Sequence, residues 1–307
     1  MKRFVTPALV LCATLISGCA SLPNVTTDQV DKRRVEYALT QNGGHAVIFE
    51  SGLGGTMDWW AKVFPEISKS TTAFAYNRPG YGKSDPVSTP RDGKHIVDEL
   101  RSLLRSRGLN PPYILVGHSL GGLYMQLFAR RYPNEVSALV LVDSTHPAQL
   151  KGAGSPENWP AWLRVAFGVA TSAVAKEELN AIDVTGEDVL GVPTFAGKPV
   201  IVLSALQPMK NTSALADDAN EKRQDIARLY PDAKQIWVDS GHGIPLENPE
   251  SVISAIREVL PKEQSRFHSA VVTSNKRVER DAPPASFACC LRRAPQFQRE
   301  AFQQMEI

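Results

Sequence analysis

Ser119 lies in the segment GHSLG, residues 117–121, with a glycine two positions before it and another two positions after it. The apolar run YILVG, residues 113–117, ends at the first glycine, and an amphipathic stretch begins at the serine. The pattern G-x-S-x-G requires a strand, a tight turn and a helix in that order, and a side chain at either glycine would clash in the turn. Such a turn exposes the serine hydroxyl at a sheet edge, with a helix N-terminus behind it to favour negative charge. Ser119 is therefore the candidate nucleophile.

His242 is the candidate base that this nucleophile needs. A serine hydroxyl is a poor nucleophile at neutral pH unless a base lies beside it. His242 follows the last predicted strand, residues 234–240, and so comes after the serine and any acid in chain order. We expect His118 to point away from the serine hydroxyl, because it lies inside the turn. The remaining histidines lie in a turn, on a helix, after a strand and in the C-terminal tail: His45, His95, His146 and His268.

The carboxylate that would orient His242 has more than one candidate. Asp143 ends the strand at 138–144, and a strand end is a rigid mount near the expected histidine. Asp217 and Asp218 lie farther along, at a predicted helix start, where acidic residues also favour the helix dipole. We favour Asp143 and keep the other two open.

Short apolar runs and amphipathic stretches alternate along the chain and must position these residues. Runs rich in Val, Ile and Leu predict buried strands at 46–50, 71–77, 113–117, 138–144, 198–205 and 234–240. Helical patterns with capping signals lie at 92–108, 119–133 and 248–260. This order predicts an α/β fold with a doubly wound, mostly parallel sheet. It also predicts a hairpin over residues 35–50 with its turn at 42–44, and a helical cap inserted at about 147–197.

Four segments together resemble the α/β-hydrolase superfamily over about residues 35–260. They are the serine turn, ESGLGGTMDWW at 50–60, NRPGYGKSD at 77–85 and SGHGIPLENPESV at 240–252. The second resembles the oxyanion loop of that superfamily, with Ser–Gly where His–Gly is commoner. The fourth resembles the segment that carries the catalytic histidine.

The resemblance implies an α/β-hydrolase fold and nucleophilic hydrolysis, most often of esters, through an acyl enzyme. It implies that the backbone N–H groups of Leu53 and Leu120 stabilise the oxyanion. The expected partner is a small-molecule acyl substrate of small or medium size. The commonest acid position of the superfamily follows the strand at 198–205, where this chain has no Asp or Glu, although some members use the position of Asp143. That departure leaves a second hypothesis: an inactive member of the fold that acts as a binding or envelope-interaction module.

Several features bear on ligands. Aromatic side chains could line an apolar acyl pocket or pack in the core: Trp59, Trp60, Trp159, Trp162 and Phe167. No cysteine–histidine cluster predicts a metal, and no glycine pattern matches a phosphate loop, so we expect no cofactor. The net charge of only +2 gives no indication of a nucleic-acid partner.

The N-terminus has the pattern of a bacterial lipoprotein signal peptide. Lys2 and Arg3 precede an apolar run that is short for a membrane span, and ISGCA at 16–20 resembles a lipobox. The resemblance implies cleavage after residue 18, lipidation of Cys19, and anchoring in the bacterial cell envelope. Because Ala20 follows the cysteine, we expect the outer membrane, facing the periplasm. A plain secretory signal is the alternative.

These features divide the chain into four predicted parts. Residues 1–18 are the signal peptide and 19–32 a tether. Residues 33–262 are the hydrolase-like domain, and 263–307 are predicted to be a disordered tail with a basic excess.

Overall fold

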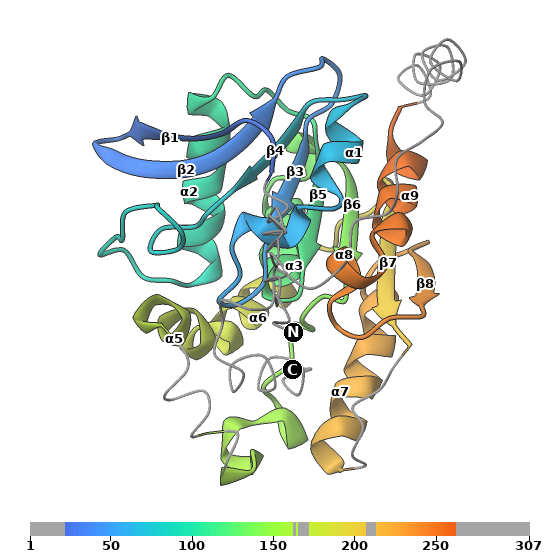
Figure 1. The fold of residues 1–307 in the computed structure, drawn as a ribbon. Helices are drawn as coiled ribbons and strands as arrows, with labels where there is room; N and C mark the ends of the chain where they lie inside the picture. Colours follow the sequence, from blue (N-terminus) through green and yellow to red (C-terminus); the bar gives the residue numbers. More distant parts are fainter. Residues whose placement is uncertain (1–21, 162–163, 165–171, 207–212, 262–307) are drawn as a thin grey trace, which may run out of the picture.

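One mixed sheet forms the centre of the protein. The computed structural model describes residues 22–161, 164, 172–206 and 213–261. Its strands are ordered β1-β2-β4-β3-β5-β6-β7-β8 across the sheet (Figure 1). They are β1 Val25–Val30, β2 Arg33–Thr40, β3 Val47–Glu50, β4 Ala73–Tyr76, β5 Tyr113–His118, β6 Val136–Val142, β7 Val200–Ala205 and β8 Lys234–Val238.

The strands from β3 to β8 pair in parallel and correspond to the predicted strands. β3, β4, β5 and β7 are buried along their whole length. A parallel strand covered on both faces has no polar side, which is why each appears in the sequence as a continuous apolar run.

The predicted hairpin at residues 35–50 is wrong. β2 pairs antiparallel with β1 and with β4, whereas β3 pairs with β4 and β5. The turn residues bond to Thr72 at the start of β4: Thr72 N–H donates to the Gly43 carbonyl at 3.1 Å, and Asn42 N–H donates to Thr72 Oγ1 at 3.2 Å. The apolar β3 instead lies between two parallel neighbours, and β4 separates it from the partly exposed β2.

The predicted tether at 19–32 is wrong over residues 25–30, which form β1. This strand pairs with β2 in the register Val25 to Ala38 and is mostly exposed. Its sequence, VTTDQV, is polar because it lies at the sheet edge, so backbone pairing rather than burial holds it there. Residues 1–21 and 262–307, which include the predicted signal peptide and tail, lie outside the described residues.

Helices cover both faces of the sheet. One face carries α2 (Gly93–Ser106), α3 (Leu120–Arg131) and α6 (Ile182–Leu190), and the other carries α1 (Phe64–Ser68) and α9 (Pro249–Val259). The remaining helices are α5 Ala173–Asn180, α7 Ala214–Asp225 and α8 Ile244–Glu247, with short 3₁₀ turns at Met57–Trp60, Pro133–Glu135, Gly152–Gly154, Pro156–Asn158 and Ile226–Leu229. The starts of α2 and α9 are capped by Asp92 and Asn248, whose side chains accept the backbone N–H three residues later.

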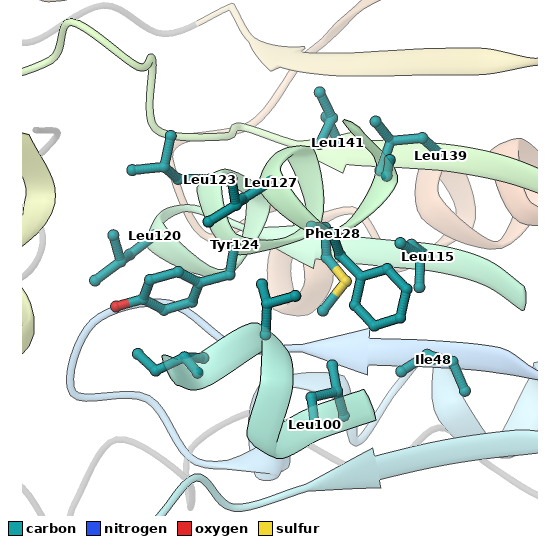
Figure 2. Close-up of a cluster of buried hydrophobic side chains, with 14 of the residues drawn as sticks. Ile48, Leu100, Leu115, Leu120, Leu123, Tyr124, Leu127, Phe128, Leu139 and Leu141 are labelled. Carbon is teal, nitrogen blue, oxygen red and sulfur yellow. The ribbon is translucent and has the colours of Figure 1, made fainter. Parts of the chain in front are cut away.

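Helix α3, which follows Ser119, is packed on nearly every side. Figure 2 shows Leu123, Tyr124 and Phe128 of this helix in one buried cluster with Leu115 of β5 and Leu100 of α2. Burial of this helix from Leu120 to Arg130 fixes its N-terminus against the sheet.

Helices α5 and α6 lie within the predicted insertion at 147–197. Helix α6 packs against α2 and α3, so part of this insertion belongs to the helical layer of the domain. Among the helices of the described ranges, none is both long and apolar enough to cross a membrane.

Candidate active site

The candidate site lies at the carboxyl ends of the parallel strands. β4 and β5 flank β3 on opposite sides, so the chain reverses its direction of progress across the sheet there. Ligands of open α/β sheets bind outside the carboxyl ends of the strands at such a reversal. The loop after β3 and the serine turn after β5 meet at this point.

Ser119 has a strained backbone that its neighbours hold. Its dihedral angles are φ 54° and ψ −126°, outside the regions that a non-glycine residue usually adopts. Its N–H donates to the Val142 carbonyl at 3.1 Å, and its carbonyl accepts from Gly122 N–H at 2.8 Å and Thr145 N–H at 3.0 Å. The turn is therefore fixed on both sides of the serine, as the motif predicts.

The loop after β3 lies in direct contact with the serine turn. A Cβ placed on Gly121 would lie 2.5 Å from the Glu50 carbonyl oxygen. A Cβ placed on Gly52 would lie 2.9 Å from Ser119 Cβ and 3.4 Å from its Oγ. Glycine is required at both positions because the two loops approach without room for a side chain.

The structure brings His242 to Asp143. His242 Nδ1 donates to Asp143 Oδ2 at 2.7 Å, and the Asp143 side chain is 1% exposed. Asp217 is exposed, and Asp218 is paired with Lys222 Nζ at 2.6 Å. Of the candidate acids, Asp143 is therefore the one placed to orient the histidine. With the proton on Nδ1, His242 keeps its Nε2 lone pair available as a base.

The serine and the histidine are linked through His118. No hydrogen bond between Ser119 Oγ and His242 occurs among the described residues. His118 Nε2 donates to the His242 carbonyl at 2.9 Å, and the two imidazole rings are 4.7 Å apart. The bond between nucleophile and base is often long in an unliganded enzyme and tightens with substrate.

His118 is held neutral. Burial, followed by the nearby His242, lowers the pKa of His118 to about 3. Its ring stacks on Trp59 with centroids 4.9 Å apart, and its Nδ1 has no hydrogen-bond partner among the described residues. Because a carbonyl only accepts, the single ring proton must lie on Nε2. The sequence predicted that His118 points away from the serine hydroxyl, but gave no sign that it holds the histidine loop.

Asp143 remains ionised despite its burial. Burial alone would raise its pKa, but the hydrogen bond with His242 and the charge of Arg223 outweigh burial and hold the pKa well below its usual range. The other oxygen, Oδ1, accepts from Ala205 N–H at 3.0 Å and from Arg223 Nε at 2.9 Å. The backbone at Asp143 has φ 39°, and its N–H donates to the Leu203 carbonyl at 2.7 Å.

Arg78 orients the loop that was expected to supply an oxyanion donor. Its Nη1 donates to the Ser51 carbonyl at 2.6 Å and its Nη2 to the Gly52 carbonyl at 2.9 Å. A trans peptide points the next N–H away from such a carbonyl. The Leu53 N–H therefore faces away from Arg78, and no acceptor among the described residues is bonded to it. Leu120 is the first residue of α3, where the backbone N–H has no partner within the helix.

A buried ion network ties this loop to helix α5. Arg78 bonds Glu50 Oε1 at 2.6 Å and both oxygens of Glu178 at 2.8 and 2.9 Å, with each of these side chains at most 1% exposed. Tyr76 donates to Glu50 at 2.6 Å, and Tyr81 donates to Glu178 at 2.9 Å. Arg78 lies in the segment NRPGYGKSD, whose pattern gave this arginine no role, and Glu178 carried no local signal in the sequence.

The other sequence candidates lie elsewhere. His95 Nδ1 is 2.8 Å from the helix cap Asp92, and His146 Nε2 is 3.2 Å from Asp225. His268 lies outside the described residues. Within the described ranges, no group of three or more His, Cys, Asp and Glu side chains is arranged to hold a metal ion.

Two of the aromatic candidates, Trp60 and Trp159, are core residues. Trp60 is 0% exposed and Trp159 is 4% exposed, which matches the core-packing alternative. Trp59 is partly exposed and stacks on the histidine of the serine turn. Trp162 and Phe167 lie outside the described residues.

Part of this chain is similar in sequence to known proteins. The family model described as "alpha/beta hydrolase fold" matches residues 45–191. The (lyso)-N-acylphosphatidylethanolamine lipase of Homo sapiens is 28% identical over 146 residues, which cover 44% of this chain and 41% of that protein. The matched segment spans between 17% and 41% of the length of the curated relatives compared.

Two solved structures have the same fold. An alpha/beta hydrolase fold protein from Burkholderia ambifaria superposes with a TM-score of 0.59 at 16% identity, covering 76% of this chain and 97% of that chain. A thermophilic esterase from Thermogutta terrifontis gives 0.54 at 20% identity, with 76% and 97% covered. At these identities the likeness concerns the fold, and it confirms the fold class expected from the sequence.

Proposed function

We propose that this chain, which has the α/β-hydrolase fold, is a serine hydrolase of the α/β-hydrolase superfamily. Its substrate would be a carboxylic ester, or a related acyl compound, of small or medium size. The single observation that carries the proposal is the 2.7 Å hydrogen bond from His242 Nδ1 to the buried Asp143 carboxylate. The names of the similar lipase and esterase support the ester class.

The proposed reaction has two halves. Ser119 Oγ attacks the carbonyl carbon while His242 Nε2 takes its proton, and the N–H groups of Leu53 and Leu120 stabilise the oxyanion. His242 then protonates the leaving alcohol, and an acyl–Ser119 ester remains. In the second half His242 takes a proton from water, which attacks the acyl carbon and releases the acid. Asp143 stays ionised and stabilises the imidazolium in both halves.

A covalent probe tests the nucleophile directly. The full chain is treated with a fluorophosphonate probe, and hydrolysis of p-nitrophenyl acetate, butyrate and octanoate is measured. We expect labelling and turnover in the wild type, and neither in Ser119→Ala. Ser106→Ala, which removes a hydroxyl at the end of α2, is the matched control and should behave as the wild type. A folded wild type without labelling or turnover would contradict the proposal.

The main argument for the alternative, an inactive binding module, no longer holds. It rested on the missing carboxylate after the strand at 198–205. Asp143 lies at hydrogen-bond distance from His242, so the missing carboxylate no longer argues against catalysis.

We also propose that the protein is a lipoprotein of the bacterial cell envelope, cleaved before Cys19 and acylated there. Support comes from the lipobox-like segment ISGCA at 16–20. Two or three acyl chains would anchor the protein stably, where one would not. Mass spectrometry of the mature N-terminus should find acyl groups on Cys19, and an unmodified terminus elsewhere would contradict this proposal.

A further inference from the structure

Arg223 reaches the candidate active site from helix α7, at a position to which the sequence gave no role. Its Nε donates to Asp143 Oδ1 at 2.9 Å, on a residue 80 positions away in sequence. Its Nη1 donates to Asn220 Oδ1 at 2.7 Å, one helical turn earlier. The Arg223 side chain is only 9% exposed. The guanidinium is therefore buried, oriented by its own helix, and aimed at the carboxylate beside His242.

The two carboxylate oxygens of Asp143 accept hydrogen bonds from different partners. Oδ2 accepts from His242 Nδ1, and Oδ1 accepts from Ala205 N–H and Arg223 Nε. Rotation of the carboxylate would break all three bonds. The loop after β6 supplies none of these donors: one comes from β7, one from α7 and one from the loop after β8.

We propose that Arg223 is a positioning residue for the catalytic acid, which fixes the Asp143 carboxylate in the orientation that His242 needs. The inference rests on the proposed hydrolase function. The positive guanidinium offsets part of the negative charge of Asp143, so imidazolium is stabilised less than it would be by an isolated carboxylate.

The other groups around the histidine stay constant in this comparison. Asp143 faces it from β6, and His118 faces it from β5 as a neutral ring. Glu247 of α8 accepts from Gly241 N–H at 2.8 Å, next to His242 in sequence. Removal of Arg223 changes the charge on the acid and leaves these groups in place.

The test is the pH dependence of kcat/KM of the full chain for p-nitrophenyl butyrate. In Arg223→Gln we expect the acidic limb of this pH profile to move to higher pH by about 0.5 to 1 unit. The shift is small because Arg223 acts on His242 through Asp143 and not as a direct partner of the imidazole. The plateau kcat should fall about tenfold, since a displaced base costs rate steeply. Arg223→Lys keeps the charge but loses the fixed geometry, so its limb should stay near the wild-type position while its kcat falls.

Arg130→Gln is the matched control. Arg130 is also a buried arginine, at 8% exposure, but it donates to backbone carbonyls such as that of Val189. This variant should lose stability and keep the wild-type pH profile. An unshifted limb in folded Arg223→Gln would overturn the inference. If that variant does not fold, an unchanged kcat in Arg223→Lys, or a limb moved upward despite the retained charge, would overturn it. Absence of wild-type turnover would instead reject the proposed function.

Discussion

Replacement of Asp143 by Asn tests the proposed acid most sharply, because the structure fixes how the amide would sit. Two donors, Ala205 N–H and Arg223 Nε, already point at the position of Oδ1. The amide oxygen must occupy that position, since an NH₂ group there would face two donors. The NH₂ group then faces His242 Nδ1 in place of Oδ2.

The magnitude follows from these bonds. Turning the amide the other way would lose two hydrogen bonds, one of them to a charged donor, at a cost of about 2–4 kcal/mol. With the amide NH₂ group facing His242, Nδ1 must accept a hydrogen bond and the ring proton must lie on Nε2. Nε2 then cannot act as the base for Ser119. The negative charge that stabilises imidazolium is lost as well. Together these effects predict a fall in kcat of about 10³- to 10⁴-fold, in the range known for this substitution in serine triads.

The assay is steady-state hydrolysis of p-nitrophenyl butyrate at pH 7.5, normalised to active sites by fluorophosphonate titration of the wild type. Asp218→Asn is the control, because it makes the same chemical change on helix α7 at a residue paired with Lys222. We expect it, and Asp217→Asn, to stay within a few fold of the wild type. The reasoning would be refuted by folded Asp143→Asn that keeps more than a tenth of wild-type kcat.

Three further predictions follow from the described contacts. Gly52→Ala should lower kcat/KM about 10- to 100-fold with little change in Tm, because its Cβ would lie 2.9 Å from Ser119 Cβ and displace the loop. Glu178→Gln should lower the free energy of unfolding in urea by about 3–5 kcal/mol, because it removes a charge from the buried pair with Arg78, and a loss below about 1 kcal/mol would contradict this. His118 has its pKa lowered to about 3 by burial, so only the unfolded chain takes up a proton as pH falls from the ordinary value near 6.5. Stability is thus lost as pH falls, and between pH 7 and 5 the wild type should lose about 1–2 kcal/mol more than His118→Gln in urea unfolding.

The elements around the nucleophile could be predicted because their signals are local. Strands β3, β4, β5 and β7 are short and buried, so each gives a mainly apolar run, and the turn at Ser119 demands glycine nearby in sequence. The pairing of β2 with β4 could not be predicted in this way. Strand partners depend on which edges are free, and the turn at 42–44 suits a crossing to β3 as well as a hairpin.

The supporting charges of the site had no local signal. Arg78 and Glu178 are 100 positions apart, and Arg223 and Asp143 are 80 apart. No periodicity or spacing joins residues at such separations, because only the folded sheet brings them together. The sequence could therefore identify Asp143 as one of several candidate acids. It could not identify Arg223, which donates to the same carboxylate as His242.

The position of Asp143 explains why the segment after β7 can lack a carboxylate. β6 and β7 are adjacent parallel strands, whose backbones run about 4.8 Å apart. Asp143 N–H bonds the Leu203 carbonyl, and its Oδ1 bonds Ala205 N–H, so this side chain lies across the end of β7. An acid mounted on β6 thus reaches the place that an acid following β7 would occupy. In this arrangement β7 supplies only one backbone N–H, that of Ala205. Arg223 supplies the second donor that holds the carboxylate toward His242.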